Sequence, residues 1–403
     1  MSSLQLPSRV LFFLAISLSI FHRQASGFNH RSLGQADGIC ATSVVNHGYK
    51  CQEIDVTTTD GFILNVQRIP QGRGGAGGGI RPPVILQHGV LVDGKAWLLN
   101  SPEQNLPMVL ADNGFDVWIV NTRGTKFSRR HISLKPSDRE FWNWSWDELV
   151  TNDLPAVFEH VQKQTGQKIH YVGHSMGTLI ALASISEGLL EGKLKSVALL
   201  SPIAYLTHMK APLAIVAAKA FVGEITALLG SGEFNPTGEL VRTFIRFLCN
   251  NPGIHCYDML TSFTGPNCCL NSSTVDLFLK NEPQSTSTKN MVHLAQMIRT
   301  GVIAKYNYGL ADYNEMAYGE SSPPVYNFSN VPRDLPMLLS YGGQDALSDD
   351  DDVTLLLKRL KSHDSEKLKV QYIKEYAHAD FVMGTSAKDL VYDPLVSFFK
   401  RRW

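Results

Sequence analysis

The chain has 403 residues, of which 44% are hydrophobic and 18% are charged. This composition supplies a large apolar core and excludes a disordered chain, and α/β enzymes of this length often fold as one decorated domain. There are 37 basic and 37 acidic side chains, so the formal net charge is zero. The balance argues against a nucleic-acid partner, which requires a basic excess, and leaves room for a neutral or lipid-like substrate.

The N-terminus is typical of a secretory signal peptide. Arg9 precedes the apolar run 10–21, which is too short to span a bilayer. The small residues Ala25 and Gly27 indicate cleavage near Gly27, so residues 1–27 form the predicted signal peptide, with a short membrane anchor as the alternative. No later run of about 18 uncharged apolar residues occurs. We therefore expect a secreted chain with no transmembrane segment in its mature form; a vacuole or lysosome-like compartment is a further destination.

The cysteine pattern predicts disulfides. An even number of cysteines remains after cleavage, as expected in a secreted chain: Cys40, Cys51, Cys249, Cys256, Cys268 and Cys269. The first two lie close in sequence and should pair. The other four should be cross-linked among themselves, but a bond between the adjacent Cys268 and Cys269 is excluded as strained. A zinc site is disfavoured because no CxxC pair or HxxxH partner lies near them.

Three Asn-X-Ser sequons are candidate N-glycosylation sites. They begin at Asn143, Asn271 and Asn327. In a secretory route, these asparagines are expected acceptors for glycans.

The chain then reads as strands that alternate with helices. Residues 53–59 and 62–69 flank Asp60-Gly61 and predict a β-hairpin. The glycine-rich stretch 72–79 is a loop, and it is a weak candidate for a phosphate loop because it precedes a strand. Short apolar runs follow and predict a mostly parallel sheet with helices on both faces: 84–87, 115–121, 169–173, 197–200, 337–340 and 370–373.

The regular alternation stops between about residues 204 and 332. We therefore expect an α/β core built from residues 28–203 and 333–403, with 204–332 inserted as a cap or lid. An insertion at this point should pack over the carboxyl edge of the sheet, where open α/β sheets bind ligands.

Gly173-His-Ser-Met-Gly177 matches the G-x-S-x-G nucleophile elbow. The predicted strand 169–173 precedes it, and an apolar, helix-like run follows it. A turn this sharp crowds the backbone on both sides, which glycine tolerates best. This context makes Ser175 the candidate nucleophile.

A serine nucleophile needs a base, and the base needs an orienting carboxylate. In folds with this elbow the order along the chain is Ser, Asp or Glu, then His. His378 follows the last predicted strand by a short loop and is the candidate base. His363 ends a polar helix-like stretch and is expected to be solvated or capping. The other histidines after the elbow, His208, His255 and His293, lie in the irregular insertion.

Asp345 is the candidate carboxylate because it is the first acid after strand 337–340 and the Gly342-Gly343 turn. The acids 349–352 compete with it and resemble a calcium cluster. We expect them instead to occupy the first turn of a helix capped by Ser348, where the helix dipole favours negative charge.

Two backbone N–H groups should form an oxyanion hole. Met176 begins the helix after the elbow and supplies one. Val90, in the loop after strand 84–87, is the candidate for the other, with Leu91 as the alternative. His88 is expected to be structural.

Seven segments of the chain together resemble the acid lipases, which include gastric lipase, lysosomal acid lipase and plant triacylglycerol lipases. They occur in order: 60–70, 86–91, 121–124 with 129–131, 141–148, 173–177, 342–345 and 376–381. The resemblance implies the α/β-hydrolase fold, a cap with a mobile lid, and hydrolysis of neutral acyl lipids. It places the triad on Ser175, Asp345 and His378. Met176 is a departure, since animal members often have Gln there, and the cysteines of the cap do not match the single cap disulfide of animal members.

Together these observations predict a secreted serine ester hydrolase. It would act at a lipid–water interface on triacylglycerols or related neutral esters, through an acyl-enzyme, with no cofactor and no metal. A sterol-ester hydrolase, an acyltransferase, and a non-catalytic lipid-binding protein of the same fold are the alternatives.

Overall fold

The computed structural model describes residues 38–75, 79–228, 230–238 and 259–401. The predicted signal peptide, Cys249, Cys256 and His255 lie outside these ranges. Within them, no helix combines the length and apolar character needed to cross a bilayer.

A single large sheet forms the centre of the described chain, in the order β1-β2-β4-β3-β6-β7-β10-β11, with β5 on β2. All neighbouring strands from β4 to β11 run parallel, whereas β1, β2 and β5 pair antiparallel at one end. The strands are β1 Gln52–Thr57, β2 Phe62–Ile69, β3 Pro83–Gln87, β4 Asp116–Val120, β5 Arg130–His131, β6 Ile169–His174, β7 Leu194–Leu200, β10 Met337–Gly342 and β11 Leu368–Ile373. The predicted hairpin and each predicted strand are therefore confirmed.

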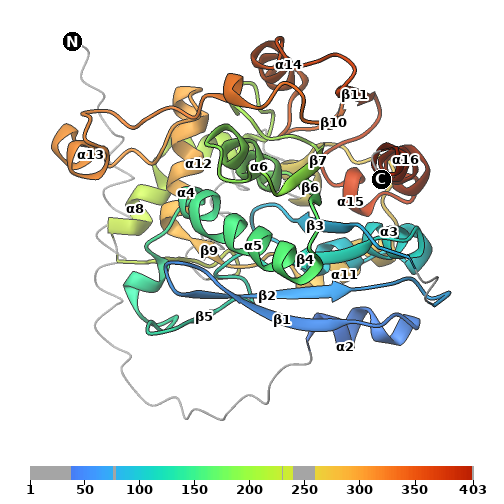
Figure 1. The fold of residues 1–403 in the computed structure, drawn as a ribbon. Coiled ribbons are helices and arrows are strands. Elements are labelled where there is room, and N and C mark those ends of the chain that lie inside the picture. The colour runs from blue at the N-terminus through green and yellow to red at the C-terminus, as the bar shows by residue number, and fades with distance from the viewer. Residues whose placement is uncertain (1–37, 76–78, 229, 239–258, 402–403) are drawn as a thin grey trace. The chain divides into compact units, whose positions relative to one another are not determined.

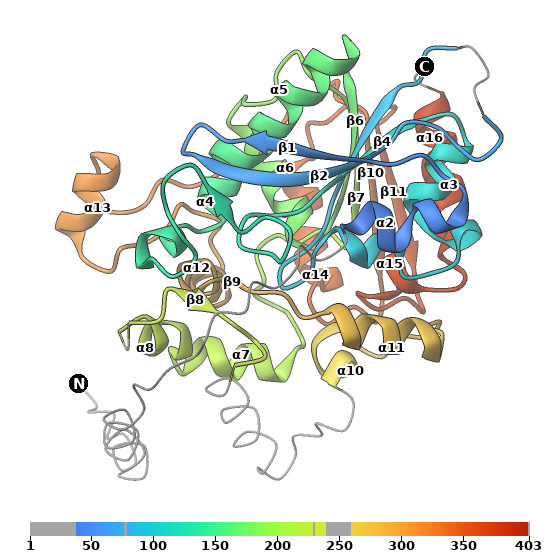
Figure 2. The ribbon, with the colours of Figure 1, turned by 90° about the horizontal axis from the view of Figure 1, so that it is seen from below.

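Helices cover both faces of the sheet (Figures 1 and 2). Alternate side chains of one strand enter different cores: Ile85 packs with α5 and α6, whereas Val84 and Leu86 pack with α3 and α16. Both faces are buried, so the central strands read as continuous apolar runs. The helices of these layers are α2 Ile39–Ser43, α3 Leu106–Asp112, α4 Trp146–Glu148, α5 Leu154–Thr165, α6 Met176–Ser186, α14 Asp350–Arg359, α15 Asp380–Met383 and α16 Asp393–Lys400.

The predicted insertion 204–332 is mostly helical in its described part. Figure 2 shows α7, α8, α10 and α11 together at one end of the sheet. The Arg299 side chain of α12 pairs with Glu224 of α8 and donates 2.7 Å to the Ala218 carbonyl of α7. These elements are α7 Pro212–Lys219, α8 Val222–Leu228, β8 Glu233–Phe234, α10 Met259–Thr264, α11 Ser272–Asn281, β9 Thr286–Ser287, α12 Thr288–Thr300 and α13 Ala311–Tyr318.

A buried ion network stabilises the end of the sheet that carries the hairpin. The Arg123 guanidinium has no exposed surface; it donates 2.6 Å to Asp60 in the hairpin turn and also pairs with Asp153. Removing one partner of such a network leaves an uncompensated buried charge.

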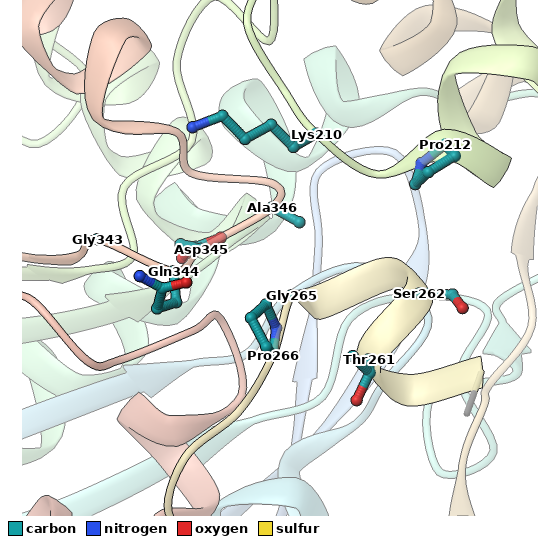
Figure 3. A pocket seen from close by; sticks show the side chains of 10 residues that line it. All are labelled: Lys210, Pro212, Thr261, Ser262, Gly265, Pro266, Gly343, Gln344, Asp345 and Ala346. Atoms are coloured by element: carbon teal, nitrogen blue, oxygen red, sulfur yellow. The ribbon is translucent and has the colours of Figure 1, made fainter. Parts of the chain in front are cut away.

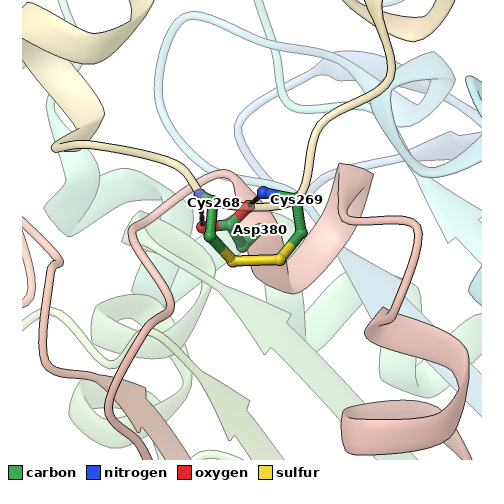
Figure 4. A group of neighbouring side chains, drawn as sticks. All are labelled: Cys268, Cys269 and Asp380. Atoms are coloured by element: carbon green, nitrogen blue, oxygen red, sulfur yellow. Dashed lines mark hydrogen bonds between the residues drawn. A yellow bond between two sulfur atoms is a disulfide. The ribbon is translucent and has the colours of Figure 1, made fainter.

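The described cysteines form two disulfides, one of which corrects the sequence analysis. Cys40 and Cys51 are bonded, as predicted. Cys268 and Cys269 are also bonded to each other, with their Cα atoms 3.7 Å apart (Figure 4). From the sequence alone, a bond between adjacent cysteines is expected to be too strained to form. In the structure a distant carboxylate, Asp380, accepts hydrogen bonds from both cysteine N–H groups and supports the bent backbone.

Candidate active site

Ser175 stands on the turn between β6 and α6. Its φ of 57° and ψ of −127° are unfavourable for a residue with a side chain. A Cβ at Gly173 would lie 2.7 Å from the Gly177 carbonyl oxygen, and one at Gly177 would lie 2.6 Å from that of Gln87. Both elbow positions therefore require glycine for close backbone approach.

Asp345 and His378 meet at the carboxyl ends of neighbouring strands, β10 and β11. The Nδ1 atom of His378 lies 3.0 and 2.9 Å from the two Asp345 carboxylate oxygens. Both residues are buried. Asp345 also accepts 2.9 and 2.8 Å hydrogen bonds from the N–H groups of Leu347 and Ser348. This geometry fixes the imidazole with Nδ1 toward the carboxylate.

The electrostatics keep Asp345 ionised. Burial acts to raise the pKa of Asp345, but the charge of His378 and the hydrogen bonds to the carboxylate outweigh it, so this pKa lies below its ordinary value.

One detail after Asp345 corrects the sequence analysis: the cap of α14 is Asp349, which accepts 2.9 Å from the Asp351 N–H, and not Ser348. The Ser348 hydroxyl instead donates to the Pro202 carbonyl, and its N–H is already used by Asp345.

Ser175 is buried beside this pair without a hydrogen bond to His378. The Nε2 atom of His378 has no hydrogen-bond partner among the described residues. Catalytic hydrogen bonds are often long before substrate binds. His174 joins the elbow to His378, the candidate base: its ring centroid lies 4.7 Å from that of His378, and its Nε2 donates 3.0 Å to the His378 carbonyl.

Sequence reasoning did not assign a role to His174. Burial, followed by the charge of His378, lowers the pKa of His174 to about 3. The ring is therefore neutral near pH 7 and acts as a hydrogen-bond donor. The signal in the sequence that could have pointed to His174 is its position directly before Ser175, the candidate nucleophile.

The loop after β3 packs directly on Ser175. A Cβ at Gly89 would lie 2.7 Å from the Cβ of Ser175 and 3.0 Å from its Oγ. His88 orients this loop: its Nε2 accepts 3.0 Å from the Thr122 N–H, so Nδ1 carries the proton and donates 2.7 Å to the Gly89 carbonyl. Burial lowers the pKa of His88 to about 4, which keeps this arrangement neutral.

The remaining candidate histidines that the structure describes lie in other environments. His363 bonds 2.8 Å to the Leu335 carbonyl, and His208 pairs with Asp352 at 2.8 Å. His293 is buried and stacks on Trp146.

Segments of the predicted insertion hold the loops of the site. The Thr264 carbonyl accepts hydrogen bonds from both Ala346, beside the acid, and His378. On the other side, the Gln284 N–H donates 2.8 Å to the Leu91 carbonyl. A cavity of about 340 Å³ lies beside the Asp345 loop (Figure 3). It is lined by Lys210, Pro212, Thr261, Ser262, Gly265, Pro266, Gly343, Gln344, Asp345 and Ala346.

A buried pair of carboxyl groups joins the insertion to the loop after β3. Glu282 and Asp93 are both almost fully buried, and the Asp93 N–H donates 3.3 Å to Glu282. Burial, followed by the charge of Asp93, raises the pKa of Glu282 to about 9. The pair therefore retains a proton at neutral pH.

Two groups in the described chain bring together side chains that metals favour: Cys268, Cys269 and Asp380, and the acids 349–351. In the first, the sulfur atoms are shared in a disulfide. In the second, Lys210 lies 2.6 Å from Asp349. Both groups are thus already engaged with protein partners.

The comparisons with known proteins agree with the fold. A family model described as "alpha/beta hydrolase fold" matches residues 82–382, and one described as "Partial alpha/beta-hydrolase lipase region" matches 40–101. Among solved structures, the monoglyceride lipase of Saccharomyces cerevisiae superposes with a TM-score of 0.55 at 14% identity, covering 94% of this chain and 99% of that chain. A carboxyl esterase from Bacillus coagulans gives 0.55 at 15% identity, covering 87% and 98%. These two likenesses concern the fold alone.

Relatives found by sequence share a much higher identity with this chain than these two structures do. Triacylglycerol lipase 2 of Arabidopsis thaliana is 56% identical over 99% of this chain and 97% of its own length. Gastric triacylglycerol lipase of Homo sapiens is 35% identical over 87% of this chain and 88% of its own. Fold and relatives define a carboxylic ester hydrolase of the α/β-hydrolase fold. Within that class, the chain belongs to the acid lipase family.

Proposed function

We propose that this chain is a secreted lipase that hydrolyses triacylglycerols or related neutral lipid esters through an acyl-enzyme. The observation that carries the proposal is the Asp345–His378 hydrogen-bonded pair at two strand ends, beside a serine on a strained elbow. Relatives named as triacylglycerol lipases support the substrate class.

In the first step, the Nε2 atom of His378 accepts the hydroxyl proton of Ser175 as the serine oxygen attacks the ester carbonyl. Asp345 holds the imidazole in the required tautomer and stabilises the imidazolium that forms. The proton then passes to the leaving alcohol. Water attacks the acyl-enzyme in the second half, again with His378 as base. Each proton transfer is assigned to a side chain, so the proposal uses no metal or organic cofactor.

The oxyanion is assigned to the N–H groups of Met176 and Val90. Met176 is the first residue of α6, so its N–H has no acceptor within that helix. The Gly89 carbonyl is held by His88. In a trans peptide the N–H points opposite to the carbonyl, so this contact also sets the direction of the Val90 N–H.

Apolar side chains on the insertion support action at a lipid–water interface. Val216, Phe221 and Ile225, on and between α7 and α8, are 36%, 51% and 40% exposed. Such a surface is favoured against acyl chains and costs free energy in water. We assign residues 204–332 as a cap whose lid opens at lipid.

Two features support the proposal that the chain enters the secretory pathway. They are the apolar run 10–21 and the Cys40–Cys51 disulfide, which needs an oxidising compartment. Asn143, Asn271 and Asn327 are all exposed, as N-glycosylation requires.

The central experiment measures hydrolysis of emulsified triolein, cholesteryl oleate and a soluble short-chain ester. Ser175→Ala should abolish all activity while the variant stays folded, because loss of the nucleophile costs about 10⁴-fold or more. Residual turnover above about 1% of wild type would refute the assignment. His378→Ala should inactivate, whereas the matched control His363→Ala should not. Preference for cholesteryl oleate over triolein would identify a sterol-ester hydrolase instead.

The lid is tested with one sparingly soluble ester measured below and above its solubility limit. A jump in rate at the limit is the expected result, since lipid favours the open population. A smooth saturating curve through the limit would mean an open esterase site.

A further inference from the structure

The Cys268–Cys269 disulfide lies between α10 and α11, and both of its backbone N–H groups point to one carboxylate (Figure 4). The Cys268 N–H donates 3.2 Å to one oxygen of Asp380, and the Cys269 N–H donates 3.1 Å to the other. In an extended chain, successive residues alternate in direction, so two adjacent N–H groups do not converge. The bond between the two side chains closes a small ring that holds the bend required for convergence.

Asp380 is fully buried, and its hydrogen-bond donors in the described chain are backbone N–H groups. The third donor is Ala377, at 2.8 Å, which immediately precedes His378. A buried carboxylate depends on such donors, because each lost hydrogen bond leaves charge unsolvated. The carboxylate therefore couples the cysteine pair to the loop that carries the candidate base.

The rest of that loop is held by the same short segment. The His378 N–H donates 3.0 Å to the Thr264 carbonyl, and the Ala379 N–H donates 3.1 Å to the Asn267 side chain. The Thr385 N–H donates 2.8 Å to the Cys269 carbonyl. The backbone around His378 is thus bonded to residues 264–269 at successive positions, and a change in the bend at 268–269 acts on His378 directly.

We propose that the Cys268–Cys269 disulfide is a reducible site that positions His378 through Asp380, so that a dithiol reductant lowers turnover and reoxidation restores it. The inference rests on the catalytic role of His378 proposed above. Cys268 is a solvent-exposed residue, so a reductant can approach this disulfide from solvent. One thiolate of the reductant attacks a cysteine sulfur and forms a mixed disulfide, which breaks the Cys268–Cys269 bond and releases the other cysteine as a thiolate that takes up a proton. The second thiol of the reductant then resolves the mixed disulfide, leaving two protein thiols and one oxidised reductant, a two-electron exchange.

The experiment titrates the full chain with dithiothreitol and measures kcat and KM on a soluble ester. Alkylation and mass spectrometry identify which cysteines have been reduced at each step. We expect kcat to fall about 10- to 100-fold once Cys268 and Cys269 are labelled, because a displacement near 1 Å is enough for such a loss. KM should stay within about twofold, and reoxidation should restore kcat.

The matched control is the C268S/C269S variant, which should have the low kcat of the reduced wild type and no further response to dithiothreitol. The C40S/C51S variant, which lacks the other described disulfide, should respond as the wild type does. D380N should have a low kcat in both redox states, since its amide nitrogen cannot accept the N–H groups. An unchanged wild-type kcat with both cysteines labelled overturns the proposal. So does a fall in the kcat of C268S/C269S on addition of dithiothreitol that equals the fall in the wild type.

A readout independent of turnover separates this proposal from the proposed function. Hydrogen exchange at residues 377–379 should accelerate on reduction of the wild type and stay constant in C268S/C269S. No acceleration would show that the disulfide does not hold the loop and overturns the positioning role, even if Ser175→Ala confirms the nucleophile. Acceleration without any change in kcat would overturn the catalytic consequence.

Discussion

Gly89→Ala gives a sharp test of how the loop after β3 serves the elbow. The added Cβ would lie 2.7 Å from the Cβ of Ser175, where ordinary contact begins at 3.4 Å. The backbone at Gly89 does not have a positive φ, so the substitution introduces a steric conflict and no conformational strain. The neighbouring atom belongs to a residue fixed by the elbow, so the loop itself must move by about 0.7 Å.

That movement shifts the Val90 N–H, which follows Gly89 directly. A shift approaching 1 Å at an oxyanion donor costs on the order of 10²-fold in rate. We therefore expect kcat on a soluble ester to fall by about that factor, with KM changed much less. Overpacking should also lower the free energy of unfolding by about 1–3 kcal/mol.

The assay compares kcat, KM and the denaturant midpoint of wild type, Gly89→Ala and Gly74→Ala. Gly74 is the matched control, because a Cβ there meets no atom within 4 Å. The control should behave as wild type in all three measurements. A Gly89→Ala enzyme with kcat within about threefold of wild type would refute the assignment of this loop to the oxyanion.

Three further variants test other contacts of the site and its support. His88→Leu removes the donor that fixes the Gly89 carbonyl, so kcat should fall about 10- to 100-fold with little change in KM, measured by steady-state kinetics; an unchanged kcat would show that the loop holds its shape unaided. Glu282→Gln should be more stable than the wild type, by a margin that grows as pH rises from about 4.5 to 9. Folding raises the pKa of Glu282 to about 9, so in this window the folded wild type keeps a proton that its unfolded chain releases. The free energy of unfolding of the wild type therefore falls as pH rises across the window. Denaturant titrations at several pH values measure this difference, and a constant difference would contradict the retained proton. Arg123→Met leaves two aspartates without their buried partner and should cost about 3–5 kcal/mol in chemical unfolding; a loss under about 1 kcal/mol would show that water reaches the site.

Most of the core could be predicted from the sequence, because the residue pattern of each segment indicates the same strand or turn that the structure has there. Asp60-Gly61 between alternating runs specifies a hairpin turn. Continuous apolar runs such as 337–340 specify strands buried on both faces. Parallel strands end at a common edge, so the positions of Asp345 and His378 directly after β10 and β11 were enough to predict that they meet.

Contacts made across long stretches of chain were not accessible to the same reasoning. The bond between Cys268 and Cys269 depends on Asp380, more than 100 residues away. Ser348 has the residue type of a helix cap, but its N–H and hydroxyl are taken by Asp345 and Pro202, and Asp349 caps the helix instead. In each case a tertiary partner decided which local alternative the chain adopts.

The Thr264 carbonyl, which bonds to the loops of Asp345 and His378 together, limits how the enzyme can be redesigned. A variant with residues 204–332 replaced by a short linker would lose the carbonyl that both loops share, and would leave them joined by the Asp345–His378 pair and by the hydrogen bond from the Gln344 N–H to the Tyr376 carbonyl. Exchange of residues 204–332 between relatives should therefore place its junction after residue 270 or before residue 260, never between them. A redesign should therefore keep residues 264–269 together with the loops that carry Asp345 and His378, to which they are hydrogen-bonded.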